Sequence, residues 1–244
     1  MKVVIQCGGK GTRLRPYTMV LPKPLMPVQS QPVLELLIKW LRRNDVRDVV
    51  ITTGYLGHII KSYCADGRKW DINITYTEEA EPLGTIGPLS MLRDRLQEPF
   101  MVINGDILTD LDIGSFASAH RQNGALVTVA TQNRKTNMDF GVIETEDGRI
   151  VSFREKPVLT NLVSMGIYCM DPAIFEYIPA GVPFGFDDLA YCLLSRGAPM
   201  HSYIHTGSWL DIGRIDDFKA AQSLDWEEHE FPREAVAPLR RSVA

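Results

Sequence analysis

The chain has 244 residues, and its 26 lysines and arginines against 30 aspartates and glutamates give a formal net charge of −4. With 45% hydrophobic and 23% charged residues, it has the composition of an ordinary globular protein that buries a substantial core. The mildly acidic balance argues against nonspecific nucleic-acid binding, which needs a basic face, but it is compatible with an anionic small molecule held by a few cations and backbone amides.

Strand-like and helix-like segments alternate through the first half of the chain. The expected segments are a strand over 3–5, a helix over 33–41, a strand over 49–53, a short helix over 59–63, a strand over 72–77, a helix over 89–96 and a strand over 100–103. This alternation is typical of βαβ units. We therefore predict an α/β fold with a Rossmann-like, mostly parallel mixed sheet and helices on both faces.

The second half is less regular. We expect strands over 125–131, 142–144, 164–170 and 201–204, and helices over 173–177, 187–195 and 215–224. Asp147-Gly148 predicts a hairpin turn, because this pair tolerates positive φ angles. From Trp226 the chain carries two prolines and mixed charge, so we expect a peripheral or partly disordered tail, with contact between copies of the chain as a further role. No hexapeptide repeat follows, which argues against an appended β-helix.

Nothing in the sequence indicates secretion or a membrane. The apolar run Val3-Val4-Ile5 ends at Gly8-Gly9, unlike a signal peptide, and no apolar stretch approaches the length of a membrane span. The four cysteines lie far apart without C-x-x-C spacing, which argues against a disulfide framework or a zinc site. We expect reduced thiols, a cytoplasmic location and no membrane partner.

A glycine-rich loop follows the first predicted strand, and it contains Gly8, Gly9, Gly11, Arg13 and Arg15. A loop at the carboxyl end of a parallel strand presents backbone amides that commonly hold phosphates, and glycines allow close approach of the ligand. Arginines pair with phosphate oxygens bidentately. The spacing fits neither a Walker loop nor a dinucleotide-binding fingerprint. The alternative is a glycine-rich turn that binds no ligand.

Prolines surround Lys23 soon after this loop. Pro22, Pro24 and Pro27 exclude a regular helix and predict a stiff, extended segment. A solvated surface lysine is the usual expectation for such a position. The place of Lys23 between two prolines, just after an anion-binding loop, favours a role at a phosphate.

Two long motifs resemble a known family. They are Gly8-Gly9-x-Gly11-Thr12-Arg13-Leu14 and Pro22-Lys23-Pro24-Leu25-x-Pro27-Val28. Together they resemble the signature of the sugar-1-phosphate nucleotidylyltransferases. Further matches in the same order are Glu81-Pro82-Leu83-Gly84-Thr85-Ile86-Gly87, Asn104-Gly105-Asp106, Phe140-Gly141-Val142-Ile143, Glu155-Lys156-Pro157 and Gly207-Ser208-Trp209-Leu210-Asp211-Ile212-Gly213. The resemblance covers residues 1–222.

This resemblance implies the nucleotide-diphospho-sugar transferase fold, in which a small sugar-binding β subregion accompanies the main sheet. A single nucleotidyltransferase domain would span 1–225. Its nucleotide-binding part would cover about 1–110 and its sugar-binding part about 111–225, followed by a tail over 226–244.

The resemblance also implies roles for individual residues. The nucleotide would be held by Gln6, Gly8, Gly9, Gly11, Thr12, Arg13, Glu81, Gly84 and Thr85. The catalytic residues would be Arg13 at the β- and γ-phosphates, Lys23 at the α-phosphate, and Asp106. Asp106 and Asp211 would hold Mg²⁺, a hard cation that takes carboxylate and phosphate oxygens. The sugar 1-phosphate would contact Gly141, Glu155, Lys156 and Ser164.

The implied reaction joins a nucleoside triphosphate and a sugar 1-phosphate into a nucleotide sugar and releases pyrophosphate. Segment 81–85 is more similar to the guanylyl and uridylyl branches than to the thymidylyl branch, and we expect GTP as the nucleotide. The compact length, the missing β-helix and Phe186-Asp187-Asp188-Leu189 resemble small bacterial enzymes that use mannose-, heptose- or hexosamine-type 1-phosphates, so we expect a sugar 1-phosphate of the mannose or heptose type. The alternatives are a uridylyl-, cytidylyl- or thymidylyltransferase, and a noncatalytic regulator that binds a nucleotide sugar. The presence of Arg13, Lys23, Asp106 and Asp211 argues against the regulator.

Two segments depart from the family pattern. Gln6-Cys7 stands in place of the usual Leu-Ala, which alters the expected contact with the base or ribose. Ser164 stands in place of an asparagine that binds sugar hydroxyls, so the identity of the sugar is left open.

His201 and His205 have no expected acidic partner, and we interpret them as surface or sheet residues rather than metal ligands. Trp209 is expected near the metal site.

Overall fold

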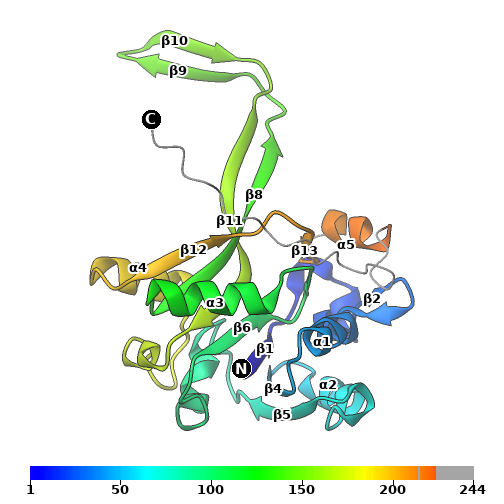
Figure 1. Cartoon of the computed structure of the whole chain (residues 1–244). Helices are drawn as coiled ribbons and strands as arrows, with labels where there is room; N and C mark the ends of the chain where they lie inside the picture. Colours follow the sequence, from blue (N-terminus) through cyan, green and yellow to red (C-terminus); the bar gives the residue numbers. More distant parts are fainter. Residues whose placement is uncertain (214, 224–244) are drawn as a thin grey trace.

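A computed structural model describes residues 1–213 and 215–223 of the chain. Its main sheet has seven strands in the order β12-β8-β11-β6-β1-β4-β5 (Figure 1). The strands are β1 Val3–Cys7, β4 Asp48–Thr53, β5 Asn73–Glu78, β6 Phe100–Asn104, β8 Val127–Asn137, β11 Val158–Met170 and β12 Met200–Ile204. Only β11 runs antiparallel to its neighbours, β6 and β8, while the other pairs are parallel. The predicted α/β fold with a mostly parallel mixed sheet is confirmed.

Different helices cover the two faces of the sheet. Helices α1 (Val33–Arg43), α2 (Gly57–Cys64) and α3 (Ile113–Asn123) pack on one face. The 3₁₀ helices η5 (Gly87–Arg95) and η6 (Pro172–Glu176) pack on the other, together with helix α4 (Phe186–Ser195). Alternate residues of β1 enter different cores, since Val3 and Ile5 join the first and Val4 the second. Val3, Val4 and Ile5 are therefore all apolar although they face different sides of the sheet, which is why the sequence predicts this strand.

Two predicted α-helices are 3₁₀ helices. Segments 89–96 and 173–177 correspond to η5 and η6. In η5 the buried side chains of Leu89 and Leu92 lie three residues apart, and a 3₁₀ helix places such residues on one side. The predicted helix over 215–224 is present as α5, Ile215–Gln222.

Helix α3 was not predicted, although its ends carry clear signals. The side chain of Asp112 accepts a hydrogen bond from the Ser115 amide (2.6 Å), and Gly124 ends the helix at φ 62°. The interior of the helix has few large apolar residues, so its periodicity is weak.

The backbone at Lys23 is folded rather than extended, contrary to the prediction. The 3₁₀ turn η3 (Lys23–Leu25) is closed by a hydrogen bond from the Leu25 amide to the Pro22 carbonyl (2.8 Å). The fixed φ of proline is compatible with such a turn, although it is incompatible with the interior of an α-helix.

An arm, defined as residues 132–163, projects from the sheet (Figure 1). Strands β8 and β11 continue past the sheet as a two-stranded ribbon. The far end carries the hairpin of β9 (Val142–Glu146) and β10 (Arg149–Arg154). Asp147 and Gly148 turn the hairpin at φ 48° and 79°, which confirms the predicted turn.

Two short two-stranded ribbons lie outside the main sheet. Strand β7 (Ile107–Thr109) pairs with β13 (Trp209–Asp211), and β2 (Pro27–Val28) pairs with β3 (Gln31–Pro32). No helix among the described residues is long and apolar enough to cross a membrane. The tail predicted over 226–244 lies outside the described residues.

Candidate functional site

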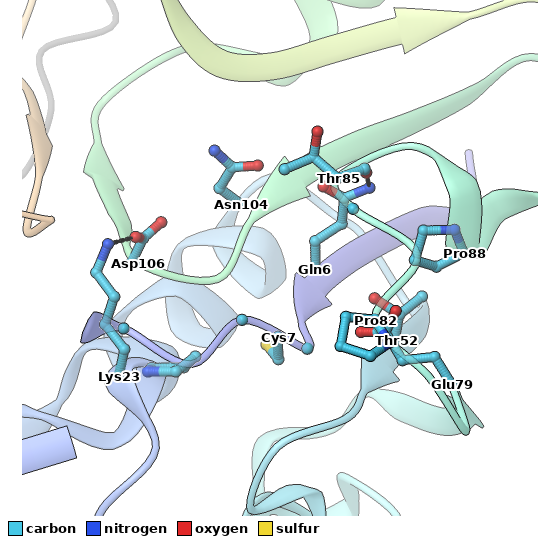
Figure 2. A pocket seen from close by; sticks show the side chains of 15 residues that line it. Gln6, Cys7, Lys23, Thr52, Glu79, Pro82, Thr85, Pro88, Asn104 and Asp106 are labelled. Carbon is cyan, nitrogen blue, oxygen red and sulfur yellow. Dashed lines mark hydrogen bonds and ion pairs between the residues drawn. The ribbon is translucent and has the colours of Figure 1, made fainter. Parts of the chain in front are cut away.

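A cavity of about 320 Å³ opens at the carboxyl ends of the parallel strands (Figure 2). It lies where the chain order reverses, because β4 and β6 flank β1 on opposite sides, and ligands of open α/β sheets bind at such a point. The residues that line it are Gln6, Cys7, Gly8, Gly9, Gly11, Lys23, Pro24, Thr52, Glu79, Pro82, Gly84, Thr85, Pro88, Asn104 and Asp106.

The glycine-rich loop forms one wall of this cavity. A Cβ atom added to Gly9 would meet no atom within 4 Å, so the loop borders open space there. Gly11 has φ 58°, and a Cβ at this position would lie 3.0 Å from atoms of both Lys23 and Thr18. Both the backbone conformation and the packing therefore require glycine at position 11.

Lys23 stands between two carboxylates at the edge of the cavity. Its ammonium forms an ion pair with Asp106 Oδ2, and Asp211 Oδ1 lies 3.6 Å away. The side chains of Lys23 and Asp106 are 17% and 16% exposed. Burial lowers the pKa of Lys23, Asp211 partly offsets this shift, and the positive charge of Arg13 lowers the pKa further. Arg13 is thus close enough to Lys23 for the two positive charges to interact.

Asp106 and Asp211 are more than a hundred residues apart in sequence, and the backbone brings them together. The Ile212 amide donates to the Asp106 carbonyl (3.1 Å), and the Gly213 amide donates to Asp211 Oδ1 (2.8 Å). Because both carboxylates already contact one ammonium, they can share another cation. An all-oxygen set completed by phosphate oxygens suits Mg²⁺. Among the described residues, no cluster of three or more His, Cys, Asp or Glu side chains offers a different metal site.

The opposite end of the cavity presents hydrogen-bond acceptors. The Gln6 amide nitrogen donates to the Thr85 carbonyl, while Gln6 Oε1 is buried and has no partner within the described structure. Glu79 Oε2 accepts from the Leu83 amide (2.8 Å), and burial raises the pKa of Glu79. The Glu79 carboxylate occupies the space that a Cβ on Gly8 would need.

Cys7 also lines the cavity, but it is not a nucleophile there. The side chain is buried, and this burial raises the pKa of its thiol well above the ordinary value. The thiolate that nucleophilic chemistry requires is therefore disfavoured.

Sequence reasoning missed three polar residues of the cavity. Glu79 directly follows β5, and Thr52 and Asn104 lie at the ends of β4 and β6. The available signal was position, because polar residues at the carboxyl ends of parallel strands face the ligand crevice. In Asn104-Gly105-Asp106 only the aspartate was given a role.

Other predicted site residues lie outside the lining of the cavity. Thr12 and Arg13 are exposed on the 3₁₀ turn η1 (Thr12–Leu14), and Glu81 is exposed. Gly141, Glu155 and Lys156 lie on the arm, where a Cβ on Gly141 would be 3.2 Å from Glu155 Oε2. The structure thus groups these arm residues with one another and not with the cavity.

Ser164 lies at the foot of the arm, next to the cavity wall. Its hydroxyl accepts from the Gly166 amide (3.3 Å), and a Cβ on Gly166 would contact the Asn104 amide nitrogen at 2.6 Å. Ser164 is therefore nearer to the cavity than the predicted residues at the hairpin.

The prediction that His205 lacks an acidic partner is wrong. Its Nε2 atom lies 2.7 Å from Asp110 Oδ1, and the two residues are 95 positions apart, so local sequence could not reveal the pair. His201 is exposed on β12, as expected. Trp209 donates from its indole to the Met165 carbonyl (3.0 Å) and stands in β13 with Asp211, which agrees with a place near the acidic pair.

Comparison with known proteins gives a consistent result. The family model described as nucleotidyl transferase matches residues 2–228. The chain is 32% identical over 238 residues to a UTP–glucose-1-phosphate uridylyltransferase of Synechocystis sp., covering 89% of this chain and 61% of that protein. It is 32% identical over 232 residues to a mannose-1-phosphate guanyltransferase of Yarrowia lipolytica, covering 92% of this chain and 64% of that protein.

A solved structure supports the fold. A putative glucose-1-phosphate thymidylyltransferase from Bacillus anthracis, in complex with a sucrose, superimposes with a TM-score of 0.74 at 26% identity and covers 93% of this chain and 96% of that chain. The present chain spans a little over three fifths of the length of the two sequence relatives.

Proposed function

The chain belongs to the nucleotidyl transferase family, and we propose that it transfers a nucleotidyl group from a nucleoside triphosphate to a sugar 1-phosphate. The products would be a nucleotide sugar and pyrophosphate. The observation that carries this proposal is the cationic Lys23, paired with Asp106 and Asp211 beside the open glycine-rich wall of the cavity. This arrangement suits two polyanionic reactants that must be held together at one phosphorus atom.

The chain's own groups account for the steps of such a transfer. The backbone of the glycine-rich loop and Arg13 would bind the β- and γ-phosphates, and Lys23 would contact the α-phosphate. An oxygen of the sugar phosphate attacks the α-phosphorus in line, and the bond to the bridging oxygen breaks as pyrophosphate leaves with its electron pair. A phosphate monoester is already anionic at neutral pH, so no general base is required. Positioning and charge stabilisation supply the rate enhancement.

We propose that Asp106 and Asp211 hold Mg²⁺. The ion would neutralise charge on the transferring phosphates. Before ligands bind, Lys23 balances the same two carboxylates, which keeps them close together despite their like charge. The support for this assignment is the shared ammonium and the oxygen-only donor set.

We propose guanine as the base, and two acceptors at the far end of the cavity support it. Guanine presents adjacent N1–H and N2–H donors, which a carboxylate with two acceptor oxygens can satisfy together. Glu79 provides such a carboxylate, and the unpartnered Gln6 Oε1 provides a further acceptor. Uracil and thymine present a single N–H between two carbonyl oxygens, and these oxygens would face the carboxylate. The relative named as a uridylyltransferase makes UTP the second candidate.

For the sugar we propose a mannose- or heptose-type 1-phosphate, in line with the relatives named as mannose-1-phosphate guanyltransferases. Lys156 would bind its phosphate, and Gly141, Glu155 and Ser164 would contact its hydroxyls. For the transfer to occur, the sugar 1-phosphate held by these residues must also reach the cavity at the edge of the sheet.

A pyrophosphate-release assay tests the proposal. The protein is given Mg²⁺, each of ATP, GTP, CTP, UTP and dTTP, and a panel of sugar 1-phosphates that includes mannose, glucose and heptose 1-phosphates. We expect the fastest release with GTP and a mannose- or heptose-type phosphate. Faster release with UTP would overturn the choice of base, and no release with any pair would favour a nucleotide-sugar-binding regulator.

A further inference from the structure

The strand that carries Asp211 is short and belongs to a two-stranded ribbon. In the β7–β13 pair, Asp211 lies opposite Ile107, the residue after Asp106, and Trp209 lies opposite Thr109, the residue before Asp110. One end of the ribbon therefore holds the acidic pair of the candidate site. The other end begins at Asp110.

A histidine–carboxylate pair closes that other end. His205 Nε2 lies 2.7 Å from Asp110 Oδ1, and the two side chains are only 12% and 19% exposed. The His205 amide also donates to the Thr131 carbonyl (2.7 Å), which anchors this residue to β8 of the main sheet. The pair thus connects the large sheet to the small ribbon.

The loop between His205 and β13 is fixed by the same group of residues. The Asp110 carboxylate occupies the space that a Cβ on Gly207 would need. The Ser208 carbonyl accepts from the Thr109 hydroxyl (3.0 Å) and from the Asp110 amide (3.2 Å). None of these loop and ribbon residues is among those that line the cavity.

The charge state of Asp110 fits this role. Burial pushes its pKa upward, but hydrogen bonds from His205 and from the Ser208 amide more than offset burial, and the pKa lies below the ordinary value. An ionised carboxylate only accepts hydrogen bonds, so His205 must carry the donated proton on Nε2.

We propose that Asp110 and His205 are positioning residues that hold β13 in register with β7 and thereby place Asp211 beside Asp106 and Lys23. The inference rests on the proposed function and assigns these two residues no contact with substrate. They act through Asp211, which lies six residues after His205 at the end of β13. The intervening loop has one further anchor to the arm, because the Gln132 amide nitrogen donates to the Gly207 carbonyl (2.7 Å).

Kinetics of His205→Ala test the proposal. Loss of a residue that orients a metal-binding carboxylate lowers activity about 10- to 100-fold. We therefore expect kcat to fall by about tenfold or more, and the Mg²⁺ concentration for half-maximal rate to rise, while KM for the sugar 1-phosphate stays unchanged. His205→Gln keeps an N–H donor within reach of Asp110 and should recover most of kcat.

His120→Ala is the matched control. It removes another buried histidine, whose Nδ1 lies 2.8 Å from the Thr128 hydroxyl between α3 and β8. This contact does not involve the β7–β13 ribbon, so we expect kcat and the Mg²⁺ requirement to stay unchanged. An equal loss of kcat in His120→Ala would indicate a general effect on stability and would overturn the proposal.

A second measurement does not depend on turnover. Binding of Mn²⁺ to the nucleotide-free protein, followed by electron paramagnetic resonance, should weaken about tenfold in His205→Ala. If melting curves show that this variant does not fold, Asp110→Asn replaces it. Unchanged kcat and Mn²⁺ affinity in a folded variant would overturn the inference. A wild-type protein that binds Mn²⁺ but releases no pyrophosphate would overturn the proposed function, and the Mn²⁺ affinities of the variants would still decide the positioning role.

Discussion

The cavity and the arm are built in opposite ways. The cavity lies at the ends of buried strands, and side chains such as Lys23 and Glu79 are held there by an ion pair and a backbone hydrogen bond. The arm has only two strands, and many of its large apolar side chains are exposed, namely Phe140, Ile143, Ile150, Val151, Phe153, Val158, Leu159 and Leu162. Segments with few buried contacts open at low free-energy cost.

The rigid cavity and the exposed arm suit two different requirements of the proposed reaction, namely positioning at phosphorus and recognition of the sugar. Displacement at phosphorus needs groups held within a fraction of an ångström, and the sheet edge supplies them. Recognition of the sugar does not need such rigid positioning. On the arm, surface residues can be substituted without disturbing the core. We therefore expect substitutions in the cavity to affect turnover, and substitutions on the arm to affect sugar binding.

The largest effect is expected for Asp106→Ala. Removal of a group that stabilises charge in the transition state costs about 10²–10³-fold in turnover. Asp211 stays beside Lys23 in this variant, so the fold should persist, as circular dichroism and melting curves can verify. Activity that survives with an undiminished Mg²⁺ dependence would contradict the role of Asp106 at the metal.

The next largest effect is expected for Glu79→Gln. An amide replaces one of the two acceptors for guanine by a donor, and kcat/KM for GTP should fall roughly 10- to 100-fold, as for other bidentate base contacts. Glu78→Gln is the matched control, because Glu78 is exposed and pairs with Lys61. An equal loss in both variants would show that Glu79 does not select the base.

The pH dependence of the wild type sharpens this prediction. Burial raises the pKa of Glu79, so the protonated form persists to a higher pH than for an exposed glutamate. Guanine binding needs the ionised form. KM for GTP should therefore rise as the pH falls through this raised pKa, and Glu79→Gln should lack this rise.

A smaller effect is expected for Lys156→Ala on the arm. Loss of one charged hydrogen bond to phosphate should raise KM for the sugar 1-phosphate about tenfold and leave KM for GTP unchanged. Lys135→Ala removes an exposed arm lysine outside the predicted site and serves as the control. If the two variants behave alike, the arm does not carry the sugar-phosphate contact.

The smallest effect is expected for a substitution on the arm, and its effect on the free energy of unfolding can be compared with that of a core substitution. Phe153→Ser on the arm, where the side chain is 60% exposed, should change the free energy of unfolding by less than about 0.5 kcal/mol. Phe116→Ala in the core, where the side chain is 0% exposed, should cost about 3–5 kcal/mol. Urea denaturation measures both. A large loss in Phe153→Ser would show that the arm packs against the rest of the protein in solution.

The same contrast explains what the sequence could predict. Strands buried on both faces, such as β1 and β6, are apolar except at Gln6 and Asn104 near their carboxyl ends, and the sequence predicts them. The outer halves of β8 and β11 were missed, because a ribbon exposed on both faces has no hydrophobic alternation. Motifs predicted a shared site for Asp106 and Asp211, and the pairing of β7 with β13 places both beside Lys23.

Contacts between distant residues that belong to no recognisable motif could not be predicted from the sequence. The Glu79 carboxylate lies against Gly8, and His205 pairs with Asp110, which is 95 residues away in the sequence. No spacing pattern in the sequence predicts either contact, because the paired residues lie far apart in the chain. The grouping of Gly141, Glu155 and Lys156 away from the cavity depends on the direction of the arm, which no local pattern determines.

The ammonium of Lys23 has one further consequence. Two neighbouring carboxylates without a compensating charge would repel each other and destabilise the folded chain. Here the ammonium of Lys23 compensates both carboxylates without a divalent ion. Chelators should therefore abolish the proposed activity and leave the melting temperature unchanged.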